Sequence, residues 1–168
     1  MRRVQSVTAI VVLLLGAACG GADAGGDSRA DSAEASAGTA AAPAASPDPC
    51  AVLTQEEMSA AIGTSVTGTE RTASTRCLYK TDNPLVYVDL EVDRENADAA
   101  WQGTGAGNAA IGAQQDTVAG LGAEALFGPR DRLYVRAGSA FVGIEAGFDD
   151  QVRARARKVA AAVLPKLR

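Results

Sequence analysis

The 168-residue sequence predicts an α+β fold, an antiparallel sheet packed with helices, over residues 49–168. Three observations predict it. A helix-capping pattern stands at residues 54–62, residues 85–92 alternate their side chains as a strand does, and residues 152–163 repeat apolar side chains at helical spacing. The segments between them add further strands and a central helix, which gives the order α-β-β-β-α-β-β-β-β-α.

The amino-terminal residues 1–18 have the three parts of a secretion signal. Arg2 and Arg3 supply a positive start, Val4 to Leu15 supply an apolar segment, and small residues follow. The apolar segment is shorter than the roughly 20 residues that a membrane-spanning helix needs. We therefore expect a cleaved signal peptide and an exported chain.

The end of this signal, Leu15-Gly16-Ala17-Ala18-Cys19, resembles the lipobox of bacterial lipoproteins, with Gly16 where the lipobox leucine usually stands. The resemblance implies diacylglycerol on the Cys19 sulfur, cleavage after Ala18, and an acyl chain such as palmitate on the new amino terminus. Several acyl chains hold a protein stably on a bilayer. The expected location is the cell membrane or the outer membrane. The alternative is an ordinary cleaved signal with an incidental cysteine.

Residues 19–48 predict a lipidated cysteine followed by a disordered tether. Beyond Cys19 the segment is mainly Ala, Gly, Ser, Asp and Pro and has no aromatic or branched aliphatic side chain. Such a composition buries too little apolar surface to offset the entropy of ordering. A flexible coil of this length spans about 30 Å, enough to hold a domain away from a bilayer.

The net charge excludes one class of partner. The chain has 16 Lys and Arg residues against 20 Asp and Glu residues, and loss of the signal removes Arg2 and Arg3, which leaves 14 against 20 and a net charge of −6. Nucleic-acid binding depends largely on neutralising phosphates with Lys and Arg. We therefore expect no nucleic-acid partner.

The first helix is predicted at residues 54–62. Thr54 and Glu57 form a capping box, Leu53 and Met58 occupy the positions of a hydrophobic staple, and Gly63 is the residue type that commonly ends a helix. Three strands follow, expected at residues 64–72, 76–80 and 85–92.

The second half of the domain is predicted as helix, loop, two strand pairs and helix. Asp93 is expected to cap a helix from Arg94 to about Trp101, and the glycine-rich residues 103–112 are expected to form a long mobile loop. Strands are expected at residues 117–121, 123–127, 133–136 and 140–146, the last two as a hairpin around residues 137–139. The final helix, capped by Asp149 or Asp150, should run to about Leu164 and end at Pro165. Its packing residues should be Val152, Ala156, Val159, Ala160 and Val163, with Leu167 extending the contact.

The remaining cysteines, Cys50 and Cys77, predict one disulfide. Two cysteines in an exported domain with no thiol chemistry nearby most simply pair with each other. The alternative is a redox pair, which the absence of a close C-x-x-C spacing disfavours.

No catalytic constellation is evident, and we expect a protein that is not an enzyme. The chain has no histidine, the commonest general base and metal ligand, and no serine stands in a G-x-S-x-G pattern. Carboxylate pairs alone can cleave sugars, so this class remains as a minor alternative. No cofactor is implied.

Three groups of residues have side chains or spacing that a binding site could use. Asp89, Glu91 and Asp93 alternate along one strand and could converge on a hard cation, although polar residues on an open sheet face are the commoner reason, and we predict no metal site. The glycines around position 105 could cradle phosphate, but they follow a helix where a phosphate loop follows a strand. The last helix carries a basic set that could dock an acidic partner or anionic lipid, or could be a solvated face: Arg153, Arg155, Arg157 and Lys158.

Several short motifs resemble a small exported domain of unknown function found in many bacterial lipoproteins. They are Asp48-Pro49-Cys50 with Leu53-Thr54, Cys77-Leu78-Tyr79, and Gly120-Leu121-Gly122-Ala123-Glu124-Ala125, with Ala123 where the family usually carries Asp. The resemblance covers about residues 49–164. It implies an exported α+β domain with the Cys50–Cys77 disulfide and implies no activity.

Two functions from different classes follow. The leading expectation is a lipid-anchored, non-enzymatic domain that binds a protein, a glycan or a small ligand at the cell envelope. The alternative is an accessory subunit that docks to a membrane complex through the basic final helix. A pocket lined by Trp101, Tyr87 or Phe127 would favour ligand binding, and an exposed patch on the final helix would favour docking.

Overall fold

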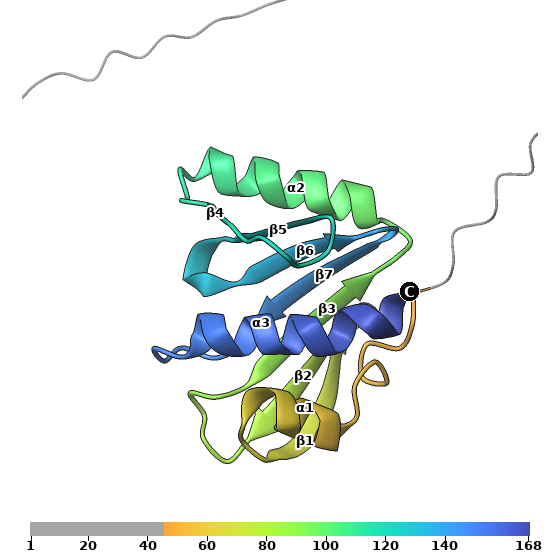
Figure 1. Cartoon of the computed structure of the whole chain (residues 1–168), viewed down its shortest axis with the longest axis vertical. Coiled ribbons are helices and arrows are strands. Elements are labelled where there is room, and N and C mark those ends of the chain that lie inside the picture. Colours follow the sequence, from red (N-terminus) through yellow and green to blue (C-terminus); the bar gives the residue numbers. More distant parts are fainter. Residues whose placement is uncertain (1–45) are drawn as a thin grey trace, which may run out of the picture. The chain divides into compact units, whose positions relative to one another are not determined.

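The structure, a computed structural model, describes residues 46–168 and consists of one antiparallel sheet with three α-helices, which confirms the α+β class (Figure 1). The α-helices are α1 (Gln55–Ile62), α2 (Ala97–Ala110) and α3 (Val152–Val163), and two 3₁₀ helices that the sequence did not predict are η1 (Pro129–Asp131) and η2 (Leu164–Leu167). The strands are β1 (Val66–Ala73), β2 (Arg76–Thr81), β3 (Val88–Asp93), β4 (Asp116–Thr117), β5 (Glu124–Phe127), β6 (Leu133–Ala137) and β7 (Ala140–Glu145).

The seven strands lie in the order β1-β2-β3-β7-β6-β5-β4, and every neighbouring pair is antiparallel. The two-residue period places apolar side chains of adjacent strands side by side. Leu90 of β3 faces Ile144 of β7, and Ile144 faces Leu133 of β6, all three fully buried. This apolar face is the side of the sheet on which the core forms.

Helices α1 and α3 cover the apolar face and pack against each other (Figure 1). The predicted stripe of α3 is buried throughout, and Leu167 of η2 extends it with 5% exposure. Helix α1 has the predicted capping box, and Gly63 ends it with a φ of 72°. The opposite face carries polar side chains and is covered by α2 over β6 and β7, where Asp98 of α2 pairs with Arg136.

The disulfide between Cys50 and Cys77 is confirmed and joins the segment before α1 to β2, with the Cα atoms 5.1 Å apart. Tyr79, two residues further along β2, is fully buried and donates its hydroxyl hydrogen to the Leu53 carbonyl at 2.9 Å. Burial raises the pKa of Tyr79 to about 12. The start of the domain is therefore held to the sheet by one covalent and one polar contact.

The prediction of a mobile loop at residues 103–112 is wrong, because α2 continues through Gly103, Gly105 and Gly107 to Ala110. Glycine costs roughly 1 kcal/mol relative to alanine in a helix. Packing outweighs this cost, since α2 places Ala97, Trp101, Thr104 and Asn108 at helical spacing against the sheet, all buried or half-buried. A Cβ on Gly103, Gly105 or Gly107 would meet nothing, so these glycines are not required by close contacts.

Two predicted helix starts were too early, that of α2 by three residues and that of α3 by one or two. Asp93 and Asp149 do accept backbone hydrogen bonds, from Asn96 at 2.8 Å and from Gln151 at 2.9 Å. These bonds close turns that precede the helices, and the helices themselves begin after Asn96 and Gln151. An aspartate therefore signalled the turn before the helix and not the helix cap.

Turns shorten two of the predicted strands by several residues. β3 begins at Val88, not Leu85, because Val86 donates to the Asn83 carbonyl and closes a turn. The strand expected at 117–121 ends at Thr117, because Gly120 has a φ of 80° and the chain leaves the extended conformation there. The hairpin between β6 and β7 is confirmed, with Ala137 paired to Ala140 and a two-residue loop between them.

Candidate functional site

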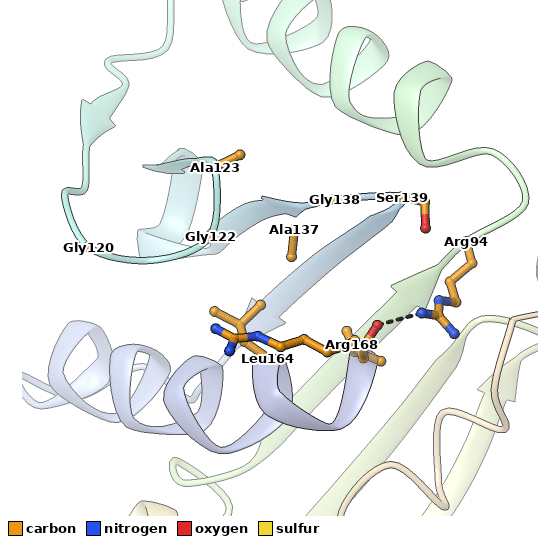
Figure 2. A pocket seen from close by; sticks show the side chains of 10 residues that line it. Arg94, Gly120, Gly122, Ala123, Ala137, Gly138, Ser139, Leu164 and Arg168 are labelled. Carbon is orange, nitrogen blue, oxygen red and sulfur yellow. Dashed lines mark hydrogen bonds between the residues drawn. The ribbon is translucent and has the colours of Figure 1, made fainter.

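A cavity of about 520 Å³ lies between the loop that joins β4 to β5, the β6–β7 hairpin and the end of α3 (Figure 2). We call it the Arg94 cavity. Small residues line most of it, and the two charged lining residues are both arginines. Its lining residues are Arg94, Gly120, Gly122, Ala123, Ala137, Gly138, Ser139, Leu164, Leu167 and Arg168.

The glycines of the β4–β5 loop shape one wall. Gly122 has a φ of 62°, and a Cβ there would lie 2.5 Å from the carbonyl oxygen of Arg136 in β6. The next residue, Ala123, donates its N–H to the same oxygen at 2.8 Å. The loop therefore lies directly against β6, which only glycine permits at position 122. With no side chain at 120 or 122, the space in front of the loop stays open.

Ala137, the hairpin and the 3₁₀ helix η2 form the remaining walls. Figure 2 shows Ala137 projecting between the glycine loop and Leu164, and Ser139 projecting from the hairpin. The register that pairs Ala137 with Ala140 leaves Gly138 and Ser139 as the tight hairpin turn, which favours small residues. Leu164 gives the cavity an apolar side, and Leu167 belongs to the buried core beneath it.

Arg94 enters the cavity from the connection between β3 and α2. Its backbone N–H donates to the Ser46 hydroxyl at 2.8 Å, and its Nη2 donates to the Leu167 carbonyl. Its Nε is buried and has no hydrogen-bond partner in the described part of the chain. Arg168, the second cation, is exposed, and its side chain lies next to Leu164 in Figure 2.

Neither arginine of the cavity has a carboxylate partner among residues 46–168. Most other arginines in this range do have one: Arg71, Arg76, Arg130, Arg132, Arg136, Arg153 and Arg155. The exception outside the cavity is Arg157, whose guanidinium lies 5.7 Å from the centre of the Phe127 ring. The cavity therefore gathers cationic charge that the fold itself does not neutralise.

A second cluster, on the polar face of the sheet, is neutralised internally. Glu145 is nearly buried, accepts a hydrogen bond from the Tyr87 hydroxyl at 2.5 Å and lies 3.7 Å from Arg132. Burial, together with the bond to this carboxylate, raises the pKa of Tyr87. Arg132 also pairs with Glu91 at 2.8 Å across Gly143, where a Cβ would come within 2.9 Å of the guanidinium. These contacts hold the sheet face together and leave no free carboxylate there.

The predicted polar residues of β3 share one face but do not gather around a cation. Asp89 pairs with Arg76 at 2.5 Å, Glu91 pairs with Arg132, and Asp93 accepts the Asn96 N–H. Within residues 46–168, no group of three His, Cys, Asp or Glu side chains is placed to hold a metal ion.

The basic set of α3 divides into structural and exposed residues. Arg155 is buried, donates to the Ala146 carbonyl at 2.9 and 3.0 Å and pairs with Asp149, so it is not available for surface docking. Arg153 is held by Asp131 and Asp116, each at 2.7 Å. Arg157 and Lys158 are exposed and form no ion pair with the described residues.

Two of the three aromatic residues named as candidate pocket residues do line a cavity, and these cavities are separate. Trp101 lines a cavity of about 380 Å³ that shares Gly120, Gly122 and Ala123 with the Arg94 cavity, so the glycine loop separates the two. Tyr87 lines another cavity of about 380 Å³, and Phe127 is buried. Cys19 lies outside the described residues.

The sequence reasoning missed the Arg94 cavity. The sequence does show small residues in two loops, Gly120 and Gly122 in one and Gly138-Ser139 in the other. It does not show that both loops lie next to the end of α3. Within the described range, no helix has the length and apolar character needed to cross a membrane. Comparisons with protein-family models, with curated proteins and with solved structures found no match to this chain.

Proposed function

We propose that this protein is a membrane-anchored bacterial lipoprotein whose α+β domain binds a small ligand in the Arg94 cavity without transforming it. The anchor rests on the secretion signal and on the lipobox resemblance that ends at Cys19. The motifs at Cys50, Cys77 and Gly120 to Ala125 support membership of the small exported domain found in such lipoproteins, to which no activity is assigned.

The observation that carries the binding function is the cavity itself. Its volume of about 520 Å³ is in the range of small-molecule sites, roughly 300–1,000 Å³. Its lining combines apolar side chains with two guanidinium groups and one hydroxyl, that of Ser139. Its lining side chains include no carboxylate, thiol or imidazole, so they offer contacts for recognition but no general acid or base of the usual kinds.

The anchor is tested by the intact mass of the protein purified from membranes in detergent, beside a Cys19→Ala variant. A mass equal to residues 19–168 plus acyl groups, less two hydrogens for the disulfide, would support it. An unacylated product would contradict it.

The binding function is tested by native mass spectrometry of the membrane-purified protein. A copurifying small molecule should be lost from Ala137→Phe, which fills the cavity, and kept by Ala161→Phe, which adds the same ring on the exposed side of α3. Retention of the molecule by Ala137→Phe would place its site elsewhere.

A second proposal is docking to a membrane complex through α3. Arg157 and Lys158 are exposed, form no ion pair with the described residues and would make the contact. Crosslinking in membranes that is lost from Arg157→Gln/Lys158→Gln and kept by Ala161→Gln would support docking.

A further inference from the structure

We infer that the Arg94 cavity binds an amphipathic anion, a carboxylate or phosphate group carried on a short apolar body. The inference rests on the proposed ligand-binding function and adds the chemical class of the ligand. Four features carry it: the unpaired arginines, the incomplete hydrogen bonding of Arg94, the apolar side at Leu164 and the open space at the glycines.

The charge of the cavity is opposite to that of the chain. Acidic residues outnumber basic ones 20 to 16 over the whole sequence, yet the lining of the cavity has two arginine side chains and no carboxylate side chain. Of the three described arginines without a carboxylate partner, two line this one cavity, Arg94 and Arg168. A planar guanidinium binds carboxylate and phosphate through paired, charge-assisted hydrogen bonds. An anionic ligand would supply the charge that the fold leaves unmatched.

The hydrogen bonding of Arg94 is also incomplete. Among the described residues only its Nη2 has an acceptor, the Leu167 carbonyl, and its Nε is buried without one. That single bond holds the guanidinium at the edge of the cavity, as Figure 2 shows. Its Nη1 is not buried and donates to no described residue, which leaves this donor for a further acceptor. The Ser139 hydroxyl, on the same side, adds a donor that rotates freely.

The remaining walls suit an apolar group. Leu164 and Ala137 present carbon to the cavity, and positions 120 and 122 present no side chain. An inorganic anion would bind to the guanidinium groups and leave this apolar surface exposed to water. A short alkyl chain would remove it from water, which is favourable by roughly 25 cal/mol per Å² of apolar area.

Isothermal titration calorimetry on the full chain carrying Cys19→Ala tests the ligand class with hexyl phosphate, hexanoate and hexanol. This background removes the acyl anchor, so no acyl chain of the protein can occupy the cavity. We expect both anions to bind at least about tenfold more tightly than hexanol, because a charge-assisted hydrogen bond has no counterpart in the alcohol.

Two variants and one control test which arginines bind the anion. Arg94→Gln and Arg168→Gln should each weaken anion binding about tenfold and leave hexanol binding unchanged. Arg168 is exposed and its side chain makes no hydrogen bond to residues 46–168, so its variant remains informative if Arg94→Gln unfolds. Arg157→Gln removes the same charge outside the cavity and should change anion binding less than about twofold at physiological salt, where screening acts over about 8 Å.

The outcomes separate this inference from the proposed function. If hexanol binds as tightly as the anions and Ala137→Phe blocks all three, the cavity is a ligand site but the anionic class is wrong. If no probe shows binding that Ala137→Phe blocks, both fail. If Arg157→Gln and Arg94→Gln lose the same amount of anion affinity, the role of the cavity arginines is overturned.

The anion has two possible sources, a membrane lipid head group or a soluble metabolite. Cosedimentation of the Cys19→Ala chain with phosphatidylglycerol vesicles but not phosphatidylcholine vesicles, abolished by Arg94→Gln, would identify the lipid. Binding of hexyl phosphate without cosedimentation would identify a soluble ligand. Cosedimentation that Arg94→Gln leaves intact, without binding of either soluble anion, would overturn the inference.

Discussion

Removal of the Cys50–Cys77 disulfide should cost about 3.5 kcal/mol of unfolding free energy. The bond closes a loop with a sequence separation of 27 residues. In the chain-entropy account, a loop of this length restricts the unfolded chain by about 12 cal/mol/K, which is roughly 3.5 kcal/mol at 25 °C. The loop contains α1, β1 and the start of β2. In the reduced protein, only the non-covalent contacts between these elements hold the two ends of the loop together.

The assay is urea unfolding of the Cys19→Ala chain, followed by circular dichroism, with and without reductant. With a urea slope on the order of 1.5 kcal/mol/M, the midpoint should fall by about 2 M. Cys50→Ala/Cys77→Ala should fall slightly further, because Cys77 is fully buried and its sulfur packs in the core. Reductant should have no effect on that double variant. A reductive loss below about 1 kcal/mol would refute the argument that loop closure is the main contribution of this bond.

Three further predictions concern single side chains. Burial raises the pKa of Tyr79 to about 12, so the unfolded chain loses this proton first as pH rises, and stability should fall between about pH 10 and about pH 12. Tyr79→Phe should remove that part of the pH dependence and cost about 1–2 kcal/mol in urea unfolding, because a buried carbonyl loses its donor; an unchanged alkaline limb would contradict this. Hydrogen bonds from Arg155 lower the pKa of Asp149, so the stability from this pair is present above about pH 4 and is lost as pH falls through the folded-state pKa. Asp149→Asn should therefore flatten the acid limb of a plot of unfolding midpoint against pH, and a limb that keeps its slope would refute the pairing. Gly122→Ala should destabilise the protein more than Gly120→Ala in thermal unfolding, because both positions have positive φ but only the Cβ at 122 meets backbone, at 2.5 Å; equal losses would mean that the loop does not lie against β6.

Local patterns in the sequence predicted those elements whose signals are local. The capping box joins Thr54 to Glu57, three residues away, and the helix starts directly after Thr54 as this pattern predicts. The stripe of α3 is a property of one helix, and each of its five predicted residues is buried. The antiparallel class followed from the alternation in β3 and from the hairpin at Gly138. None of these depends on which distant segment lies alongside.

The errors arose where a distant contact outweighs the local signal. Three glycines in α2 favour a loop by propensity, and only the packing of Trp101 and Asn108 on the sheet makes a helix there. A helical continuation was visible in the spacing of Ala97, Trp101, Thr104 and Asn108. That pattern is weak because threonine and asparagine occupy two of its four positions. The glycine content therefore predicted a loop, and the weak spacing pattern did not outweigh it.

The basic set of α3 shows why side-chain charge alone did not locate a binding site. Arg153, Arg155, Arg157 and Lys158 look equivalent in sequence, yet two of them are held by carboxylates within the fold. What distinguishes a binding arginine from a structural one is whether the fold supplies its counter-charge. Sequence does not give this for Arg94, which is 73 residues from its acceptor at Leu167.

The same criterion ranks the two polar regions of the domain. The cluster around Glu145 is the more buried, but it is balanced by Tyr87 and Arg132, and an entering ligand would have to displace those contacts. In the Arg94 cavity no ion pair needs to break before an anion binds, because its arginines have none among the described residues. Desolvation of two guanidiniums opposes binding, but the single bond to Leu167 already orients one of them. The less buried site is thus the better candidate, because binding there adds contacts and removes none.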